Sequence, residues 1–226
     1  DDVAELSGLV GVSKAYMGDG TDRLEVSLAS LTPITLSENG FESSAVTLIT
    51  DSTLEMLVIN NDAPETVLLV SEGNTYTVPY AVFAIHVTGT LDVSSISFVG
   101  NAELVESGIE LSATSIDGTL YTDLDFISLK DGGAETIVIE EANDLEIRAG
   151  LKGFALEKTS GDLFIRLNSA GATLSHTGGE FLVEGAGAEI ALIADNFEFL
   201  AGAETLKGSG QVSIIPYTAD TDIWIG

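Results

Sequence analysis

The sequence predicts an all-β protein made of two modules of sandwich or jelly-roll type. Three observations support this fold class: apolar and polar residues alternate in short runs, Gly, Asn, Asp and Ser bound those runs, and helical periodicity is scarce. Short strands that recur about every ten residues are typical of sandwiches, jelly rolls and β-solenoids. The clearest runs are 24–28, 46–49, 54–59, 66–70, 76–78, 83–87, 96–99, 126–129, 136–139, 145–147, 163–167, 181–183, 189–193, 197–200 and 212–215.

Turn signals between these runs favour the same fold class. Asn39-Gly40, Asp117-Gly118 and Asp131-Gly132-Gly133 supply residues that tolerate a positive φ between strands. Pro79 cannot donate a hydrogen bond to a sheet, so we expect it to end a strand or to lie at a sheet edge.

A change in composition near residues 101–118 divides the chain. Residues 23–105 carry the prolines of the loops and are expected to form the first sandwich or jelly-roll module. Residues 106–226 have shorter runs separated by Gly and Ala, and are expected to form a second β-rich module. From residue 136 the apolar centres recur about every nine residues, which fits a meander and equally the coils of a β-solenoid.

Residues 1–22 are expected to form a short N-terminal arm or helix. Val3, Leu6, Val12 and Tyr16 recur at roughly helical spacing, so residues 2–17 could form an amphipathic helix. The alternative is an arm without regular structure. In either form, the segment is expected to dock on a neighbouring subunit.

The C-terminal end is expected to be a strand. Ile223 and Ile225 alternate with Trp224, so such a strand would be apolar on both faces. A strand of that kind is expected to dock into the sheet of its own subunit or against a neighbouring subunit.

Charge and hydropathy exclude several classes of function. Lys and Arg number 8 and Asp and Glu number 36, which gives a net charge of −28 and disfavours nucleic acid and anionic membranes as partners. The apolar runs are far shorter than the roughly 20 residues that span a bilayer, so no membrane insertion is expected. Hydrophobic residues make up 45% of the chain, too many for a disordered protein, and the large negative charge favours a saline or calcium-bearing medium outside a cell.

Catalysis has few candidate residues, and we expect the protein not to be an enzyme. His86 lies between Ile85 and Val87, so alternation predicts that it faces solvent from a strand. His176 is expected at a turn, as a surface contact or a ligand. No G-x-S-x-G nucleophile motif occurs, and close carboxylate pairs are expected by chance among so many acids.

Calcium is the one cofactor that the sequence indicates, because hard cations prefer the oxygen ligands that acidic loops supply. No acidic cluster matches an EF-hand loop or the Gly-Gly-x-Gly-x-Asp repeat, so solvated turn acids are the alternative interpretation. The metal candidates are Asp19 and Asp22, Asp220 and Asp222, and a less favoured cluster of Asp117 with Asp123 and Asp125.

One stretch carries a resemblance to a known group of proteins. Residues 73–90, GNTYTVPYAVFAIHVTGT, followed by 96–100, ISFVG, resemble the strand-turn-strand text of β-rich virion surface proteins of tailed phages. The resemblance implies a jelly-roll-like, non-catalytic subunit repeated on a particle, as in head decoration or fibre proteins. Secreted filament subunits of archaea and bacteria share the same acidic, cysteine-free character.

These observations together predict a structural protein that assembles with copies of itself and with other structural subunits. We expect it on a virion surface, or in an extracellular filament or layer at the cell surface. The alternative is a carbohydrate-binding or adhesive module, with or without a dependence on calcium. Assembly predicts large contacts between copies, whereas a lectin predicts a concave pocket with an aromatic floor.

Overall fold

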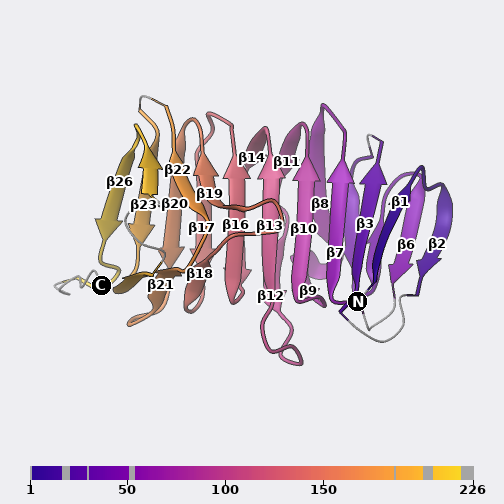
Figure 1. Cartoon of the computed structure of the whole chain (residues 1–226), viewed down its shortest axis with the longest axis horizontal. Coiled ribbons are helices and arrows are strands. Elements are labelled where there is room, and N and C mark those ends of the chain that lie inside the picture. Colours follow the sequence, from indigo (N-terminus) through magenta and orange to yellow (C-terminus); the bar gives the residue numbers. More distant parts are fainter. Residues whose placement is uncertain are drawn as a thin grey trace.

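In the computed structural model, the chain winds through successive coils that stack along the long axis of the molecule (Figure 1). The structure describes residues 2–16, 21–29, 31–50, 54–185, 187–200 and 206–219. One coil contains β7 (Met56–Asn61), β8 (Thr66–Ser71) and β9 (Thr75–Val78). The next contains β10 (Val82–Val87), β11 (Thr90–Asp92) and β12 (Ser97–Gly100).

Each strand pairs in parallel with the equivalent strand of the neighbouring coil. β10 pairs with β7, β11 with β8 and β12 with β9, all in parallel. One full coil advances the chain by 26 residues, from Met56 to Val82 and from Val82 to Gly108. A chain whose consecutive strands belong to different sheets, and whose sheets are built from consecutive coils, is a parallel β-solenoid.

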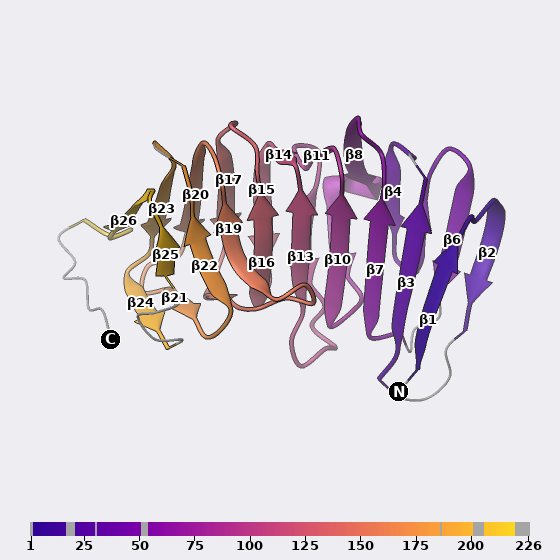
Figure 2. The ribbon, with the colours of Figure 1, turned by 45° about the horizontal axis from the view of Figure 1, so that its top comes forward.

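Three sheets run along the solenoid, and Figure 2 shows strands of the longest one side by side. Among the described residues, sheet A has 12 strands and sheets B and C have 7 each. Sheet A contains β1 (Val3–Ser7), β3 (Arg23–Leu28), β7, β10, β13 (Gly108–Ala113), β16 (Phe126–Asp131), β18 (Leu145–Ile147), β19 (Phe154–Lys158), β21 (Thr173–His176), β22 (Glu180–Val183), β24 (Asn196–Phe199) and β25 (Leu206–Gly208).

Sheets B and C complete the coils. Sheet B includes an antiparallel hairpin at the predicted Asn39-Gly40, where Glu38 and Asn39 form the turn and Gly40 begins the second strand. Gly40 has a φ of +127°, and an added Cβ would lie 2.0 Å from the carbonyl oxygen of Leu48. Sheet B contains β2 (Gly11–Ala15), β4 (Ile34–Ser37), β5 (Gly40–Glu42), β6 (Val46–Thr50), β8, β11 and β14 (Ser115–Asp117). Sheet C contains β9, β12, β15 (Thr119–Asp123), β17 (Ile137–Glu141), β20 (Asp162–Leu167), β23 (Glu189–Ile193) and β26 (Gln211–Ile215). A single 3₁₀ turn, Glu72–Asn74, is the helical structure of the described chain.

The core consists of inward-facing side chains that stack from coil to coil. Because side chains alternate across a strand and the pairing is in register, each inward residue lies about 4.8 Å from its counterpart in the next coil. These ladders bury most of the apolar residues in the predicted runs. Two ladders of sheet A are Leu24, Leu57, Phe83, Ile109, Ile127, Ile147, and Val26, Ile59, Ile85, Leu111, Leu129, Leu156.

The cross-section changes along the molecule. Sheet B ends at β14, and the turn Asp131-Gly132-Gly133 then leads from β16 to β17 in sheet C. From residue 145 onward, each coil crosses sheet A as two half-strands, β18 and β19, then β21 and β22, then β24 and β25. The chain between two half-strands is therefore free to leave the sheet.

A buried ion pair lies inside the coil where sheet B ends. Lys158 Nζ donates to Asp131 Oδ2 at 2.5 Å and to the carbonyl oxygens of Gly133 and Glu135 at 2.9 and 3.0 Å. Asp131 Oδ1 accepts the backbone N–H groups of Gly133 and Ile116. Ile116 belongs to β14, so this carboxylate satisfies a donor on the outer edge of the last strand of sheet B.

The predicted all-β character is confirmed, but the predicted sandwich or jelly-roll modules are wrong. Alternation identifies strands correctly, yet it does not show that each strand pairs in parallel one coil away. The repeat was obscured because the coils differ in length: 33 residues separate Arg23 from Met56, and 18 separate Gly108 from Phe126. The solenoid that we considered only for the second half extends through the whole described chain.

The N-terminal expectation also needs correction. Residues 3–7 and 11–15 form β1 and β2, which pair in parallel with β3 and β6, so this segment is neither a helix nor an arm without regular structure. The expected module boundary at residues 105 and 106 falls in the loop between β12 and β13, and sheet A continues across it from β10 to β13. The predicted terminal strand with Trp224 lies outside the described residues.

Candidate functional site

A short segment crosses the outer face of sheet A between the half-strands β18 and β19. This segment, residues 148–153, is termed the strap, and in Figures 1 and 2 it extends across the neighbouring strands toward β13. The N–H groups of Leu151 and Lys152 donate to the carboxylate of Glu110, which faces outward from β13. Ser128 on β16 donates to the carbonyl oxygen of Arg148 at 2.7 Å. The strap is thus held by two strands of sheet A.

Gly150 allows the strap to lie this close to the sheet. A Cβ added at Gly150 would lie 2.2 Å from Glu110 Oε2 and 2.8 Å from Ser128 Oγ. No side chain larger than hydrogen fits there unless the strap moves away from the sheet.

Arg148 fixes the start of the strap. Its guanidinium donates two hydrogen bonds, of 3.0 and 3.1 Å, to Glu106 and lies 3.4 Å from the centre of the Phe126 ring. The hydrogen bonds from Arg148 hold the pKa of Glu106 below its usual value.

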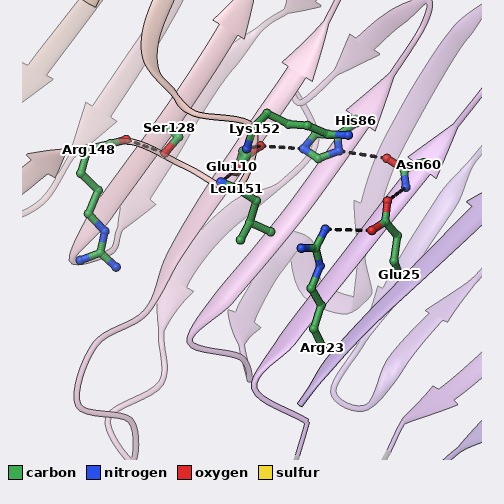
Figure 3. Close-up of polar contacts among 9 residues, drawn as sticks. All are labelled: Arg23, Glu25, Asn60, His86, Glu110, Ser128, Arg148, Leu151 and Lys152. Carbon is green, nitrogen blue, oxygen red and sulfur yellow. Dashed lines mark hydrogen bonds and ion pairs between the residues drawn. The ribbon is translucent and has the colours of Figure 1, made fainter. Parts of the chain in front are cut away.

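A chain of polar contacts leads from β3 across the sheet to the strap (Figure 3). Arg23 donates to Glu25 at 2.8 Å, and the side-chain amide of Asn60 donates to the same carboxylate at 2.7 Å. His86 Nδ1 lies 3.0 Å from Asn60 Oδ1, and His86 Nε2 lies 2.8 Å from Glu110 Oε1. Arg23, Glu25, Asn60, His86 and Glu110 are termed the polar chain.

The partners on either side of His86 orient its ring. Asn60 donates its amide hydrogens to Glu25, so its oxygen faces His86 and can only accept a hydrogen bond from Nδ1. The carboxylate of Glu110 accepts two backbone N–H groups and lies 2.8 Å from His86 Nε2. His86 and Glu110 are thus in close contact through side chains that are only 11% and 1% exposed.

The first carboxylate of the polar chain is also tuned by its neighbours. Burial acts to raise the pKa of Glu25, but the hydrogen bond from Asn60 and the positive charges of Arg23 and Lys152 outweigh it and lower the pKa. Glu25 therefore stays ionised and keeps accepting from Asn60, which preserves the donor directions along the whole polar chain.

A groove of about 570 Å³ runs beside the strap on the outer face of sheet A. Its floor is a row of outward-facing residues that occupy the same register in successive coils, and its wall is the end of the strap. The floor residues are Asn60, His86, Ser112, Lys130, Glu157 and Leu182, and the wall includes Lys152, Gly153 and Phe154.

The sequence-predicted site residues are only partly placed by the structure. Asp22 is buried, and its Oδ1 accepts the N–H of Asp2 at 2.9 Å. Asp19, Asp220 and Asp222 lie outside the described residues, so a calcium site at these positions stays a prediction. Within the described ranges, no three His, Asp or Glu side chains gather as a group that could hold a metal ion.

The acids of the less favoured cluster each accept a hydrogen bond from another residue of the chain. Asp117 accepts a hydrogen bond from Ser115 at 3.0 Å, Asp123 accepts one from Asn143, and Asp125 accepts the N–H of Ser107. Asp123 and Asp125 line a common surface hollow, whereas Asp117 does not.

The surroundings of the two histidines differ from those that the sequence predicted. His86 faces outward as alternation predicted, but the strap and its polar partners leave it mostly covered. His176 ends β21 and faces inward, 3% exposed, in the ladder that contains Ile147 and Phe199. The expectation of a turn residue at the surface was wrong because the alternation Leu174, His176 continues the inward face for one more position.

Sequence reasoning did not identify the polar chain or the strap. Asn60 and Glu110 lie 26 and 24 residues from His86, about one coil to either side. A polar residue that recurs at one coil length is the signal that could have found them, once the coil length was known.

No protein-family model, curated protein or solved structure matches the chain. Among the described residues, no helix has the length and apolar character needed to cross a membrane.

Proposed function

We propose that the chain is a non-catalytic structural subunit that assembles end to end with further copies, outside a cell or on a virion. The observation that carries this proposal is the open edge of sheet A at both ends of the solenoid. In the part of the chain that the structure describes, β1 at one end and β24 and β25 at the other pair with a strand on one side only. Unpaired edge strands are templates for adding another strand.

The backbone groups on these edges face outward in the way that a further coil would need. Asp2 O accepts the N–H of Arg23, so by alternation the N–H and C=O groups of Val3, Glu5 and Ser7 point away from β3. At the other end, the N–H groups of Asn196 and Leu200 donate to the preceding coil, so those of Phe197 and Phe199 point away from it. A β1 strand of one copy can therefore continue the parallel ladder beyond β24 of another.

Apolar side chains gather at the same ends. Most of the large exposed apolar residues of the described chain lie in or directly beside the first two strands, or in the last coil. These residues are Val3, Val10, Val12 and Tyr16 at one end, and Leu200, Ile215 and Tyr217 at the other. Because the two ends differ, the contact is head to tail and produces an open filament rather than a closed dimer.

The net charge sets the conditions for assembly. A charge of −28 on each copy opposes the approach of another, and screening shortens the range of this repulsion to about 10 Å at 0.1 M salt. Assembly is therefore expected to increase with ionic strength.

Glu5 offers a sharp test of the open edge. Its side chain is exposed and its N–H points to the edge, so Glu5→Pro removes an edge donor without breaking a hydrogen bond to β3. Glu5→Ala is the matched control, because it removes the same side chain and keeps the N–H. Sedimentation velocity and electron microscopy over a range of salt should show filaments for the wild type and Glu5→Ala, and folded monomers for Glu5→Pro.

Two results would overturn the proposal. One is a wild-type protein that stays monomeric at every salt concentration. The other is a Glu5→Pro variant that forms the same filaments as the wild type while its circular dichroism spectrum is unchanged.

A further inference from the structure

The groove on sheet A has the length of a chain-like ligand. It extends from Asn60 on β7 to Leu182 on β22, across β10, β13, β16 and β19. With neighbouring strands about 4.8 Å apart, these six strands span about 24 Å. The elongated row of floor residues favours a linear ligand over a compact one.

The chemistry of the floor favours a ligand rich in hydroxyl groups. All floor residues except Leu182 carry side chains that donate or accept hydrogen bonds, including Asn60, Ser112 and Glu157, and Thr88 also lines the groove. The strands beneath are already paired on both sides, so the floor has no backbone groups with which a peptide could pair as an added strand. Phe154 adds one aromatic ring to the wall.

Lys152 favours a ligand that carries negative charge. The other lysine of the groove is compensated, since Lys130 lies 2.7 Å from Glu157. Glu180 in turn pairs with Lys207 at 3.7 Å. No carboxylate of the described residues lies within ion-pair distance of the Lys152 ammonium, although the chain has 36 acidic residues.

The strap presents this ammonium to the groove, where its charge lowers the pKa of Glu25 without an ion-pair contact. The backbone of Lys152 is fixed by Glu110, and Figure 3 shows its side chain extending along the His86 ring. A single-stranded nucleic acid would need several aromatic side chains on which to stack its bases, whereas the lining of the groove includes a single Phe, Phe154, and no Tyr or Trp. A carboxylate carried on a sugar chain meets Lys152 while its hydroxyl groups meet the floor.

We propose that this groove binds a linear oligosaccharide whose sugar units carry carboxylates, with Lys152 as the carboxylate-binding residue. This site is separate from the open edges that would join copies, so binding and assembly can succeed or fail independently. Asn60, Ser112 and Thr88 supply the hydrogen bonds to the sugar hydroxyl groups.

Isothermal titration calorimetry with oligogalacturonate tests the proposal on the full chain. The matched ligand is the methyl-esterified oligomer, which keeps the hydroxyl groups and lacks the negative charges. The matched variants are Lys152→Ala and Lys14→Ala, because Lys14 is exposed on β2, far from the groove, and its loss changes the net charge equally. Ser112→Phe, which fills the floor of the groove, serves as the blocking variant.

The proposal expects oligogalacturonate to bind, with affinity weakened about tenfold by Lys152→Ala and unchanged by Lys14→Ala, a difference of about 1.4 kcal/mol. The methyl ester should bind at least as weakly to the wild type as the acid binds to Lys152→Ala, and folded Ser112→Phe should not bind. Absence of binding to wild type, equal binding of acid and ester, or equal effects of the two lysine variants would each overturn the proposal.

Discussion

Two ion pairs lie next to each other on the same two strands, one outside the solenoid and one inside. Lys130 on β16 and Glu157 on β19 face the groove at 2.7 Å, with side chains 43% and 19% exposed. Asp131 and Lys158, the next residue on each strand, face inward at 2.5 Å and are fully buried. A shift of one residue along a strand thus separates a solvated surface contact from a charge pair in the core.

The two ion pairs are expected to contribute differently to stability, because their surroundings differ. Water and salt screen the outer pair, and such pairs contribute about 0–1 kcal/mol. The inner pair satisfies all three donors of Lys158 and joins the turn after β16 to the last strand of sheet B. The inner pair stabilises this turn because it provides hydrogen-bond partners for backbone groups that would otherwise be buried without them.

The largest expected effect follows from breaking the inner pair. Lys158→Met keeps most of the side-chain volume but leaves Asp131 buried without its cation, and should lower the free energy of unfolding by about 3–5 kcal/mol. Lys130→Met, the matched change one register position away, should cost at most about 1 kcal/mol. Urea unfolding at neutral pH measures both. Equal losses would show that burial does not distinguish the two pairs.

This comparison also shows what the sequence could and could not predict. The strand near Leu163 and Leu167 was predicted correctly, because inward apolar residues alternate there as they do in β20. The inward position of Lys158 could not be predicted, because its partner Asp131 is 27 residues away, one variable coil length. Parallel pairing between coils leaves no local signal comparable to a hairpin turn.

The same reason limits prediction of the candidate site. The outward orientation of His86 followed from Ile85 and Val87, and the structure confirms it. The partners of His86 and the crossing of the strap depend on which coil lies beside which, and on Gly150 approaching Glu110. These contacts depend on how the coils stack, and the alternation of residues within one strand carries no information about that stacking.

The second largest effect on stability is expected from the buried hydroxyl group of Tyr80. Tyr80 is buried with its hydroxyl 3.1 Å from Thr50 Oγ, and burial raises the pKa of Tyr80 to about 12 from 10.0. The unfolded chain ionises first, so this stabilisation is complete below pH 10 and is lost as the pH rises toward 12. The loss amounts to about 2.7 kcal/mol, at 1.36 kcal/mol for each pKa unit.

Tyr80→Phe tests this expectation. The variant should lose about 1 kcal/mol at neutral pH with the hydrogen bond to Thr50, and should fall less steeply in stability between pH 10 and 12. Burial also raises the pKa of Tyr76, so part of the alkaline loss should remain. Urea unfolding across this pH range measures both slopes, and an unchanged slope in Tyr80→Phe would contradict the assignment.

The smallest expected effect distinguishes the two histidines, one on each side of sheet A. His176 lies in an apolar ladder, its Nε2 has no hydrogen-bond partner within the described chain, and its ring centre lies 5.6 Å from that of Phe181. Burial lowers the pKa of His176 below 6.5. Below pH 6.5 the unfolded chain takes up a proton that the native interior resists, so stability is complete above pH 6.5 and falls as the pH decreases, by at most about 1.4 kcal/mol per pH unit.

Comparing His176→Leu with the wild type between about pH 7.5 and 5 cancels the contributions of the carboxyl groups, and the variant should lack this acid-side loss. His86→Leu is the matched control, because it removes a histidine that is hydrogen-bonded at both ring nitrogens and leaves His176 in place, so it should shift the stability without removing the slope. If His86→Leu instead removed the slope and His176→Leu kept it, the acid sensitivity would belong to the outer face and the assignment to the interior would be wrong.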